Sequence, residues 1–230
     1  MRAPFLNIDA GELDPEREPA ELYRLAHVVN VACGGHAGDD ASMKRVIEAC
    51  LSCGTRVGAH PSFPDRAGFG RRAMPIEAEA LLASIAEQCH ALASVARQAG
   101  AIIGFAKLHG ALYHSAHADE AIADAALRGT IEALGWEIAV VGPRGGAIEK
   151  RTRELGVRFA VEGFADRGVR ADGTLVPRGQ PGDLVSDPAL AAERARALAA
   201  SVDTICVHGD TPNALSIARA VRRVVDEVAR

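Results

Sequence analysis

Short apolar runs alternate with amphipathic stretches along the whole chain. Each apolar run ends in polar residues or glycine and is followed by residues with the spacing of a helix that is apolar on one face. Runs that are apolar at nearly every position are typical of parallel strands covered by helices on both sides. Seven such runs predict strands, at Phe5–Gly11, Val28–Gly34, Thr55–Pro61, Ala101–His109, Glu137–Gly142, Val157–Asp166 and Thr204–Asp210.

The stretches between these runs predict helices. No linker or change of composition divides residues 1–230, so we expect a single domain. A closed seven-stranded parallel (β/α) barrel and an open doubly wound sheet both fit this order of elements. The predicted helices span Glu18–His27, Asp39–Cys53, Ile76–Gln98, Asp119–Leu134, Gly145–Leu155 and Pro188–Ala200, with a last helix that has Thr211 as N-cap, Pro212 as first residue and its end near Arg230.

Polar residues gather at the carboxyl ends of the predicted strands, where parallel α/β folds bind their ligands. Four of the eight histidines and one of only three lysines fall there. Six strands contribute such residues, and a barrel brings six strand ends around one centre more readily than an open sheet does. The pattern therefore favours the barrel. The candidate residues are Asn7, Asp9, Glu12, Asn30, His36, His60, Arg66, Lys107, His109, Tyr113, Glu162, Arg167, His208 and Asp210.

Simpler structural roles fit other polar residues. Asp39 and Asp40 are placed to cap a helix, and the neighbours Asp65–Arg66 and Asp166–Arg167 fit surface ion pairs of little energetic weight. The five cysteines are an odd number without a metal-ligand pattern, so we expect free thiols. Single histidines at strand ends also have structural roles, but four at equivalent positions of different strands indicate a shared site.

Composition excludes several classes of function. A net charge of −4 and an aromatic content of 4% argue against nucleic-acid binding. The chain contains neither the phosphate-binding loop of mononucleotide sites nor a dinucleotide fingerprint. It shows no signal peptide and no apolar run long enough to cross a membrane, which predicts a cytoplasmic protein.

The candidate residues predict hydrolysis or proton transfer. Carboxylates and imidazoles occur without a nucleophile-elbow serine, so we expect no covalent intermediate. One interpretation has carboxylates and imidazoles exchanging protons while Lys107 stabilises a developing anion. The other has Asp9, His36, His60 and His109 binding a divalent metal. The spacing of these residues does not separate the two.

Five segments around these residues resemble the LamB/YcsF family over essentially the whole chain. They are NVACGGHAGD (Asn30–Asp39), GAHPSFPDRAGFGRR (Gly58–Arg72), KLHGALY (Lys107–Tyr113), EGFADRGV with DGTLVPR (between Glu162 and Arg178) and ICVHGDTPNAL (Ile205–Leu215). The resemblance implies a seven-stranded barrel like that of the glycoside hydrolase/deacetylase superfamily.

The family supplies one component, called A, of bacterial ATP-dependent 5-oxoprolinases. The resemblance therefore implies hydrolysis of 5-oxo-L-proline to L-glutamate, in a complex in which the partner components B and C use ATP. On this basis we expect Asp9 or Asp210 as the base and His109 or His208 as the acid. Lys107 and Arg66 would bind the anionic groups.

Two alternatives remain open from the sequence. One is a metal-dependent hydrolase of a small amide or sugar substrate, similar to the deacetylases of the same superfamily. The other is a protein that binds a metabolite or supports the complex without catalysis. The ring of polar residues argues for catalysis, because sugar-binding sites commonly need aromatic platforms and this chain has few aromatic residues.

Overall fold

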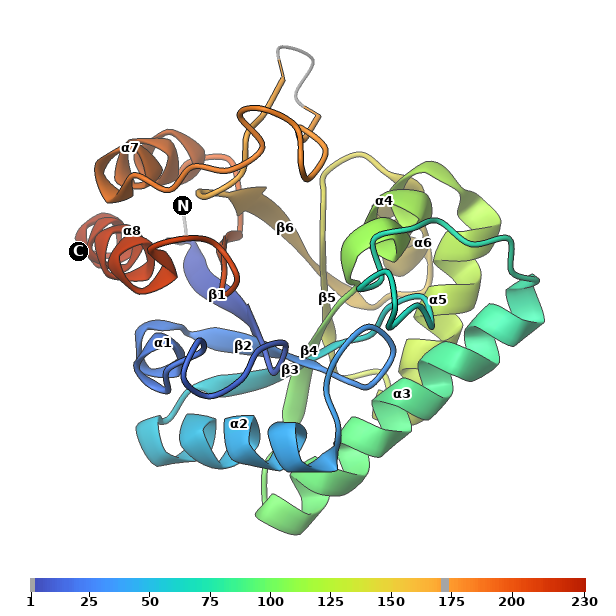
Figure 1. The fold of residues 1–230 in the computed structure, drawn as a ribbon. Helices are drawn as coiled ribbons and strands as arrows, with labels where there is room; N and C mark the ends of the chain where they lie inside the picture. Colours follow the sequence, from blue (N-terminus) through green and yellow to red (C-terminus); the bar gives the residue numbers. More distant parts are fainter. Residues whose placement is uncertain (1–2, 171–173) are drawn as a thin grey trace.

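The computed structural model of the protein describes residues 3–170 and 174–230. In this part of the chain, seven parallel strands form a closed barrel in chain order, with the last strand paired to the first (Figure 1). The barrel prediction is therefore confirmed over the open sheet. The strands are β1 (Phe5–Ala10), β2 (Val28–Ala32), β3 (Arg56–His60), β4 (Ile103–Lys107), β5 (Ala139–Gly142), β6 (Arg158–Phe164) and β7 (Thr204–His208).

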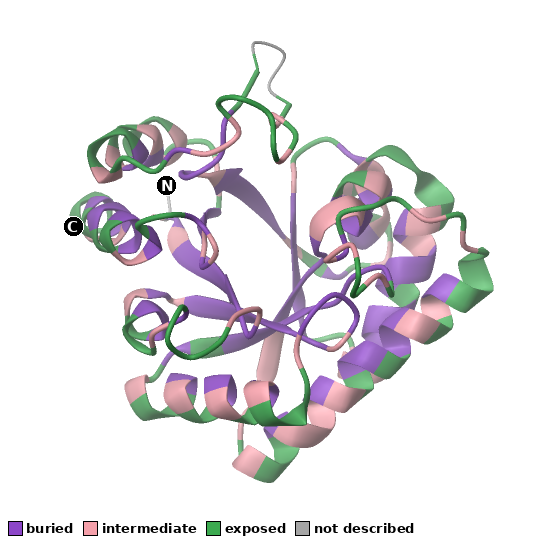
Figure 2. Ribbon diagram, in the orientation of Figure 1, coloured by how far each residue is buried: buried purple, intermediate pink, exposed green. Residues whose placement is uncertain are grey.

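Helices surround the barrel on its outer side. Their buried faces point to the strands and their exposed faces point outward (Figure 2). No helix of the described residues combines the length and apolar character that crossing a membrane requires. The helices are α1 (Glu21–Leu25), α2 (Asp40–Cys53), α3 (Ala78–Ala99), α4 (Gly110–Ala118), α5 (Glu120–Leu134), α6 (Ala147–Glu154), α7 (Pro188–Leu198) and α8 (Ala214–Val228).

The interior of the barrel changes from apolar to polar along the strands. Alternate residues of a strand point to opposite faces, so Leu6 and Ile8 of β1 pack under the helices while Asn7 and Asp9 join the polar interior. The amino-terminal end of the barrel is filled by apolar side chains, and the carboxyl end is lined by polar ones. The apolar cluster consists of Phe5, Val28, Phe105, Ala139, Val141 and Ala160.

The first helix starts later than predicted. Helix α1 begins at Glu21, and Glu18 instead belongs to the preceding loop. Its buried carboxylate accepts hydrogen bonds from the backbone N–H groups of residues 11, 12 and 13, at 2.6, 3.1 and 3.2 Å. The hydroxyl of Tyr23 donates a fourth, at 2.6 Å. Glu18 therefore fixes the loop that carries Glu12.

Two other helices differ from the prediction, one in its boundary and one in its presence. The last helix has Asn213, with φ of 65°, as its N-cap rather than Thr211. The cause is that the Thr211 hydroxyl donates a hydrogen bond of 2.6 Å to Asp166 and so stays with β6. A helix that the sequence pattern did not predict, α4, begins directly after His109.

The predicted helix cap and free cysteines are confirmed. Asp39 caps α2, because its carboxylate accepts the Ser42 N–H at 2.8 Å while the Ser42 hydroxyl accepts the Asp39 N–H at 2.8 Å. Asp40 lies in the first turn of the same helix. The cysteines are free thiols, and all except the half-buried Cys53 are buried.

Candidate active site

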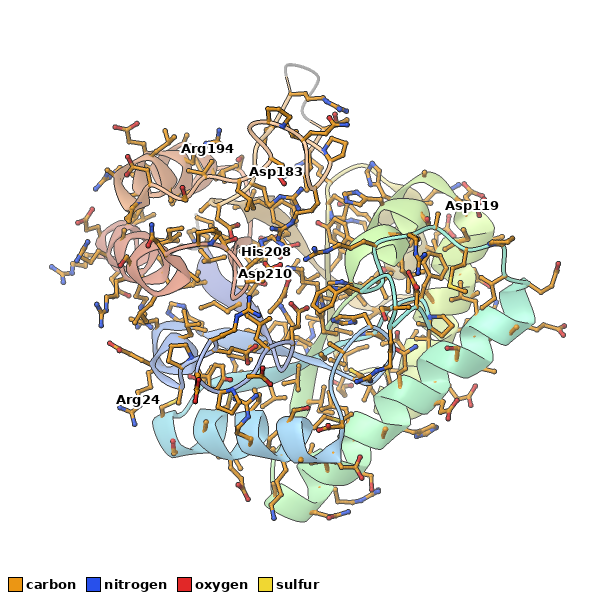
Figure 3. All side chains as sticks on the ribbon, in the orientation of Figure 1. Arg24, Asp119, Asp183, Arg194, His208 and Asp210 are labelled. Carbon is orange, nitrogen blue, oxygen red and sulfur yellow. The ribbon has the colours of Figure 1, made fainter. Side chains whose placement is uncertain are left out.

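A cavity of about 610 Å³ opens over the carboxyl ends of the strands. His208 and Asp210, labelled in Figure 3, lie over the centre of the barrel, whereas Arg24 and Asp119 lie at its outside. A second cavity of about 380 Å³ adjoins the first and shares Glu12 with it. Of the predicted residues, Asp9, Glu12, His60, Lys107, His109, Tyr113, Arg167, His208 and Asp210 line the first cavity, and Glu12, His36 and Arg66 line the second.

Lys107 lies at the centre of one buried group, which we call the lysine network (Lys107, Asp9, Glu162 and Cys206). Its ammonium is 3.0 Å from Asp9 Oδ2, 2.9 Å from Glu162 Oε1 and 3.0 Å from Cys206 Sγ. Burial alone would lower the pKa of Lys107, but these partners, Asp9 first, raise it well above its ordinary value. Burial raises the pKa of Asp9, but His60 and Lys107 outweigh it and hold that pKa low. Lys107 and Asp9 are therefore both charged.

Two asparagines lie deeper in the barrel than the lysine network and form hydrogen bonds to its carboxylates. Asn30 donates hydrogen bonds of 2.9 Å each to Asn7 Oδ1 and Asp9 Oδ1. Asn7 donates to Glu162 Oε1 at 3.0 Å and to the Thr204 hydroxyl at 2.8 Å. Neither asparagine lines the cavity, nor does Glu162. All three candidate residues are buried beneath the cavity, where they orient Asp9 and Lys107.

Three histidines converge on Glu12 in a second buried group, the histidine cluster (Glu12, His36, His60 and His109). Glu12 Oε1 is 3.0 Å from His36 Nε2, 3.6 Å from His60 Nε2 and 3.3 Å from His109 Nδ1. The rings of His36 and His109 are stacked with centroids 3.6 Å apart. Burial lowers the pKa of His60 to about 3, so this imidazole is neutral at physiological pH.

The backbone around the cluster fixes two of its rings. His60 Nδ1 donates to the carbonyl oxygen of Lys107 at 2.8 Å, and His109 Nε2 donates to that of Phe69 at 2.9 Å. Gly70, with φ of 64°, lets the loop pass against these rings, since a Cβ there would lie 2.9 Å from His109 Cδ2 and from His36 Cβ. Burial raises the pKa of Glu12, but the contacts with His109 and His36 bring it well below its ordinary value.

The partner of His208 was not predicted from the sequence. Asp166 is buried and accepts hydrogen bonds from His208 Nδ1 at 3.0 Å and from the His208 backbone N–H at 2.8 Å. Asp166 therefore does not form the surface ion pair with Arg167 that the sequence suggested. Its position just after β6, equivalent to the other candidates, is the signal that could have identified it. His208 Nε2 is left facing the cavity, 3.9 Å from Asp9 Oδ2.

Arginines hold Asp210 at the mouth of the cavity. Its carboxylate is 2.6 Å from Arg71 Nη2 and 3.1 Å from Arg178 Nη2. Both arginines line the cavity, and both lie in segments that carried the family resemblance. These contacts make Asp210 a poorer candidate base than a carboxylate with a free oxygen.

The remaining predicted residues have varied positions. Arg66 does not reach Lys107, because its guanidinium donates to the carbonyl oxygens of Gly34 and Gly38 at 2.9 and 2.8 Å in the second cavity. The structure therefore does not bring Arg66 and Lys107 together around one anion. Arg167 lines the first cavity but binds the carbonyl oxygens of Asp183 and Val176. Burial, and Glu162 next to it, raise the pKa of Tyr113 well above its ordinary value, so this cavity residue stays a phenol.

The model of the LamB/YcsF family matches residues 6–229. The chain belongs to the LamB/YcsF family. Its membership confirms the resemblance that the five segments indicated. Among similar family members, the A component of a 5-oxoprolinase from Methylococcus capsulatus is 39% identical, over 94% of this chain and 90% of the relative. The corresponding protein from Streptomyces avermitilis is 40% identical, over 94% and 93%.

Solved structures support the same assignment. The crystal structure of a lactam utilization protein from Thermus thermophilus matches this LamB/YcsF chain over almost its full length. The match covers 99% of this chain and 97% of the Thermus thermophilus chain. The TM-score is 0.87 and the identity is 33%. A family 4 carbohydrate esterase from Streptomyces lividans has a TM-score of 0.51 at 10% identity, covering 98% and 88% of the two chains. This second likeness shows the fold alone and agrees with the expected deacetylase-like barrel.

Proposed function

We propose that this protein is the A component of an ATP-dependent 5-oxoprolinase and opens the ring of 5-oxo-L-proline to give L-glutamate. The observation that carries the proposal is the match over 94% of the chain to relatives that are named as this component of a 5-oxoprolinase. Their names describe them as one subunit among several, which implies a complex. We propose that its other members are the B and C components expected from the family resemblance.

The chemistry of the lactam explains the need for partners. A five-membered lactam is a poor electrophile with a poor leaving group, and transfer of phosphate to its carbonyl oxygen makes the carbon susceptible to water. Because the sequence has no recognisable nucleotide loop, we assign ATP binding and phosphate transfer to the partner subunits. Water then adds to the carbon, the C–N bond breaks, and a second water releases phosphate from the resulting acyl phosphate.

His208 is the side chain best placed to move the proton in ring opening. Its Nδ1–H is held by Asp166 at 3.0 Å, which leaves Nε2 free to accept a proton from the attacking water. Asp9, 3.9 Å away, stabilises the imidazolium that forms. The same nitrogen then protonates the leaving ring nitrogen. His109 is less suitable as the acid, because its Nε2 is bound to the Phe69 carbonyl and its Nδ1 faces His60 and Glu12.

The charged residues of the cavity divide into two functions. Lys107 is already balanced by Asp9 and Glu162, and it fixes the carboxylate beside His208. Arg71 and Arg178 share the single carboxylate of Asp210 at the mouth and so retain positive charge. We assign binding of the substrate's carboxylate or phosphate to these two arginines.

Reconstitution tests the proposal. The protein combined with its B and C partners is expected to release glutamate from 5-oxoproline and ATP, and the isolated chain is expected to release none. His208→Ala should abolish most of this activity, while His90→Ala, at an exposed position of α3, should not change it. Robust turnover by the isolated chain would contradict the division of labour, and full activity of His208→Ala would contradict the proton-transfer role.

The histidine cluster favours one alternative, a metal-dependent amide hydrolase. Such an enzyme would act on a small amide without ATP and without partner subunits. Hydrolysis of N-acetyl compounds by the isolated chain, lost in His60→Ala, would support it. A metabolite-binding protein without catalysis would instead keep the activity of the complex in both His208→Ala and Asp9→Ala.

A further inference from the structure

We propose that the histidine cluster is a binding site for one divalent cation of the zinc class. Its ligands are Glu12 Oε1, His36 Nε2, His60 Nε2 and His109 Nδ1, which lie within 4.8 Å of one another. The site lies at the same end of the barrel as the proposed ring opening, but its assignment rests only on the geometry of the cluster. The test measures metal binding, so its result does not depend on whether the proposed enzymatic activity is found.

The placement of protons in the cluster indicates a missing cation. A carbonyl oxygen can only accept, so the contacts of His60 Nδ1 with Lys107 O and of His109 Nε2 with Phe69 O put the ring protons on those nitrogens. A neutral ring with this proton placement offers its other nitrogen as an acceptor, and these two nitrogens, His60 Nε2 and His109 Nδ1, are only 3.0 Å apart. Glu12 Oε1, a third acceptor, faces both. Three lone pairs directed at one another repel unless a proton or a metal ion lies between them, and the spacing of the donors and their surroundings favour the metal ion.

The spacing of the donor atoms fits a metal ion. Tetrahedral zinc with bonds of about 2.0–2.1 Å to nitrogen and oxygen separates its ligands by about 3.3–3.4 Å. The contacts of Glu12 Oε1 with the three ring nitrogens measure 3.0, 3.6 and 3.3 Å. Nitrogen ligands with one carboxylate are also a donor set that suits zinc, whereas magnesium and calcium take mainly oxygen.

The surroundings of the rings have the support that metal ligands usually receive. A histidine that binds a metal commonly donates its other ring N–H to a carbonyl or carboxylate, which fixes the ring. His60 and His109 both do so. His36 lacks this support, because its Nδ1 has no hydrogen-bond partner among the described residues. We therefore expect His36 to contribute least to the affinity.

The other group of possible ligands, Asp9, Cys206 and His208, makes a useful contrast. The ammonium of Lys107 lies 3.0 Å from both Asp9 Oδ2 and Cys206 Sγ, so a positive charge is already built into that group. A divalent cation there would be repelled. In the histidine cluster, no lysine or arginine forms an ion pair with Glu12 within the described residues.

The cluster can be reached from solvent. Glu12 lines both cavities, His60 and His109 line the larger one, and His36 lines the smaller one. The ligands therefore stand in the wall between two open spaces, and an entry path is one of the requirements of a metal site. A divalent cation bound there supplies Lewis acidity to a substrate in the larger cavity.

Calorimetric titration of the tag-free, chelator-treated protein with zinc chloride tests the inference. We expect one equivalent to bind, with the affinity lowered at least about 100-fold in His60→Ala and less in His36→Ala. Glu12→Gln, which keeps the shape of the side chain, should also weaken binding if His60→Ala folds poorly. His90→Ala on α3 and His208→Ala on the same rim are matched controls and should bind as the wild type does.

Cobalt(II) gives a second readout of the same site. In a site of four or five protein ligands its visible absorption is much stronger than in water, and we expect this band in the wild type and not in His60→Ala. Three results would overturn the inference: no stoichiometric zinc in the wild type, equal affinity in His60→Ala, or equal affinity in Glu12→Gln. The first would mean that a proton holds the three acceptors together.

Discussion

The lysine network and the histidine cluster lie next to each other at one end of the barrel, and Asp9 Oδ2 is 3.5 Å from His60 Nε2. Both gather acceptor atoms in a buried space, but they balance charge differently. The lysine network contains its own cation, whereas in the histidine cluster three imidazoles surround the Glu12 carboxylate and burial keeps His60 neutral. The difference indicates that the chain completes the first group by itself and leaves the second to be completed by a ligand.

Removing Lys107 should have the largest effect. Lys107→Met leaves Asp9 and Glu162 buried without their counter-ion, and loss of one partner from a buried ion pair costs about 3–5 kcal/mol of folding free energy. Urea unfolding measures this loss, which should be accompanied by loss of activity in the reconstituted complex. Lys44→Met, at an exposed helix position, is the control and should change stability by less than about 0.5 kcal/mol. A stable Lys107→Met protein would mean that the network is not held by charge.

Asp166→Asn should test whether Asp166 orients His208 for proton transfer or only supports the fold. The amide keeps the shape but does not hold the His208 Nδ1–H as a carboxylate does, and it does not stabilise the imidazolium. We expect kcat of the complex to fall by about 10²–10⁴-fold, the range of general acid–base catalysis. The KM for 5-oxoproline should change little, because Asp166 does not line the cavity. An unchanged kcat would transfer the proton-transfer role to another residue.

Zinc should stabilise the protein through the histidine cluster alone. At a free concentration 100 times the dissociation constant, binding to the folded state adds about 2.7 kcal/mol to the free energy of unfolding. Urea unfolding with and without zinc should show this gain in the wild type and in His90→Ala. The gain should be absent in His60→Ala. Equal stabilisation of His60→Ala would place the cation elsewhere.

The barrel and most of the site could be predicted because they depend on local sequence. Six of the seven strands end in their own polar residues, so Asp9, Lys107 and His208 could be located at the rim from the pattern alone. The pairing of Asp166 with His208 could not be predicted from the sequence, because it depends on how the segment after β6 lies against β7. There, Ala165 donates its backbone N–H to the carbonyl oxygen of Cys206.

Arg66 shows a second feature of the site that the sequence pattern did not predict, the direction of a side chain in a loop. It lies in the irregular segment between β3 and α3, in which Phe69 and Gly70 have positive φ values of 55° and 64°. Such a path has no periodicity from which the direction of a side chain could be predicted. The same segment sends Arg71, rather than Arg66, to the first cavity. The position of a residue near a strand end was enough to predict that it lies at the rim of the barrel. It was not enough to predict which cavity the side chain of a loop residue enters.

The smallest effect we predict is the pH dependence of the Asp166 contribution to stability. Burial raises the pKa of Asp166, but His208 and the hydrogen bonds to its carboxylate outweigh burial and hold that pKa below the ordinary 3.8. A carboxyl whose pKa is lower in the folded state stabilises the fold above its unfolded pKa, and this contribution is lost as the pH falls through the folded value. The stability difference between wild type and Asp166→Asn should therefore be constant above about pH 5 and narrow below pH 3.8. Urea unfolding at a series of pH values measures this difference. A difference that widened as the pH fell would mean that Asp166 is protonated in the folded protein and does not act as the anionic partner of His208.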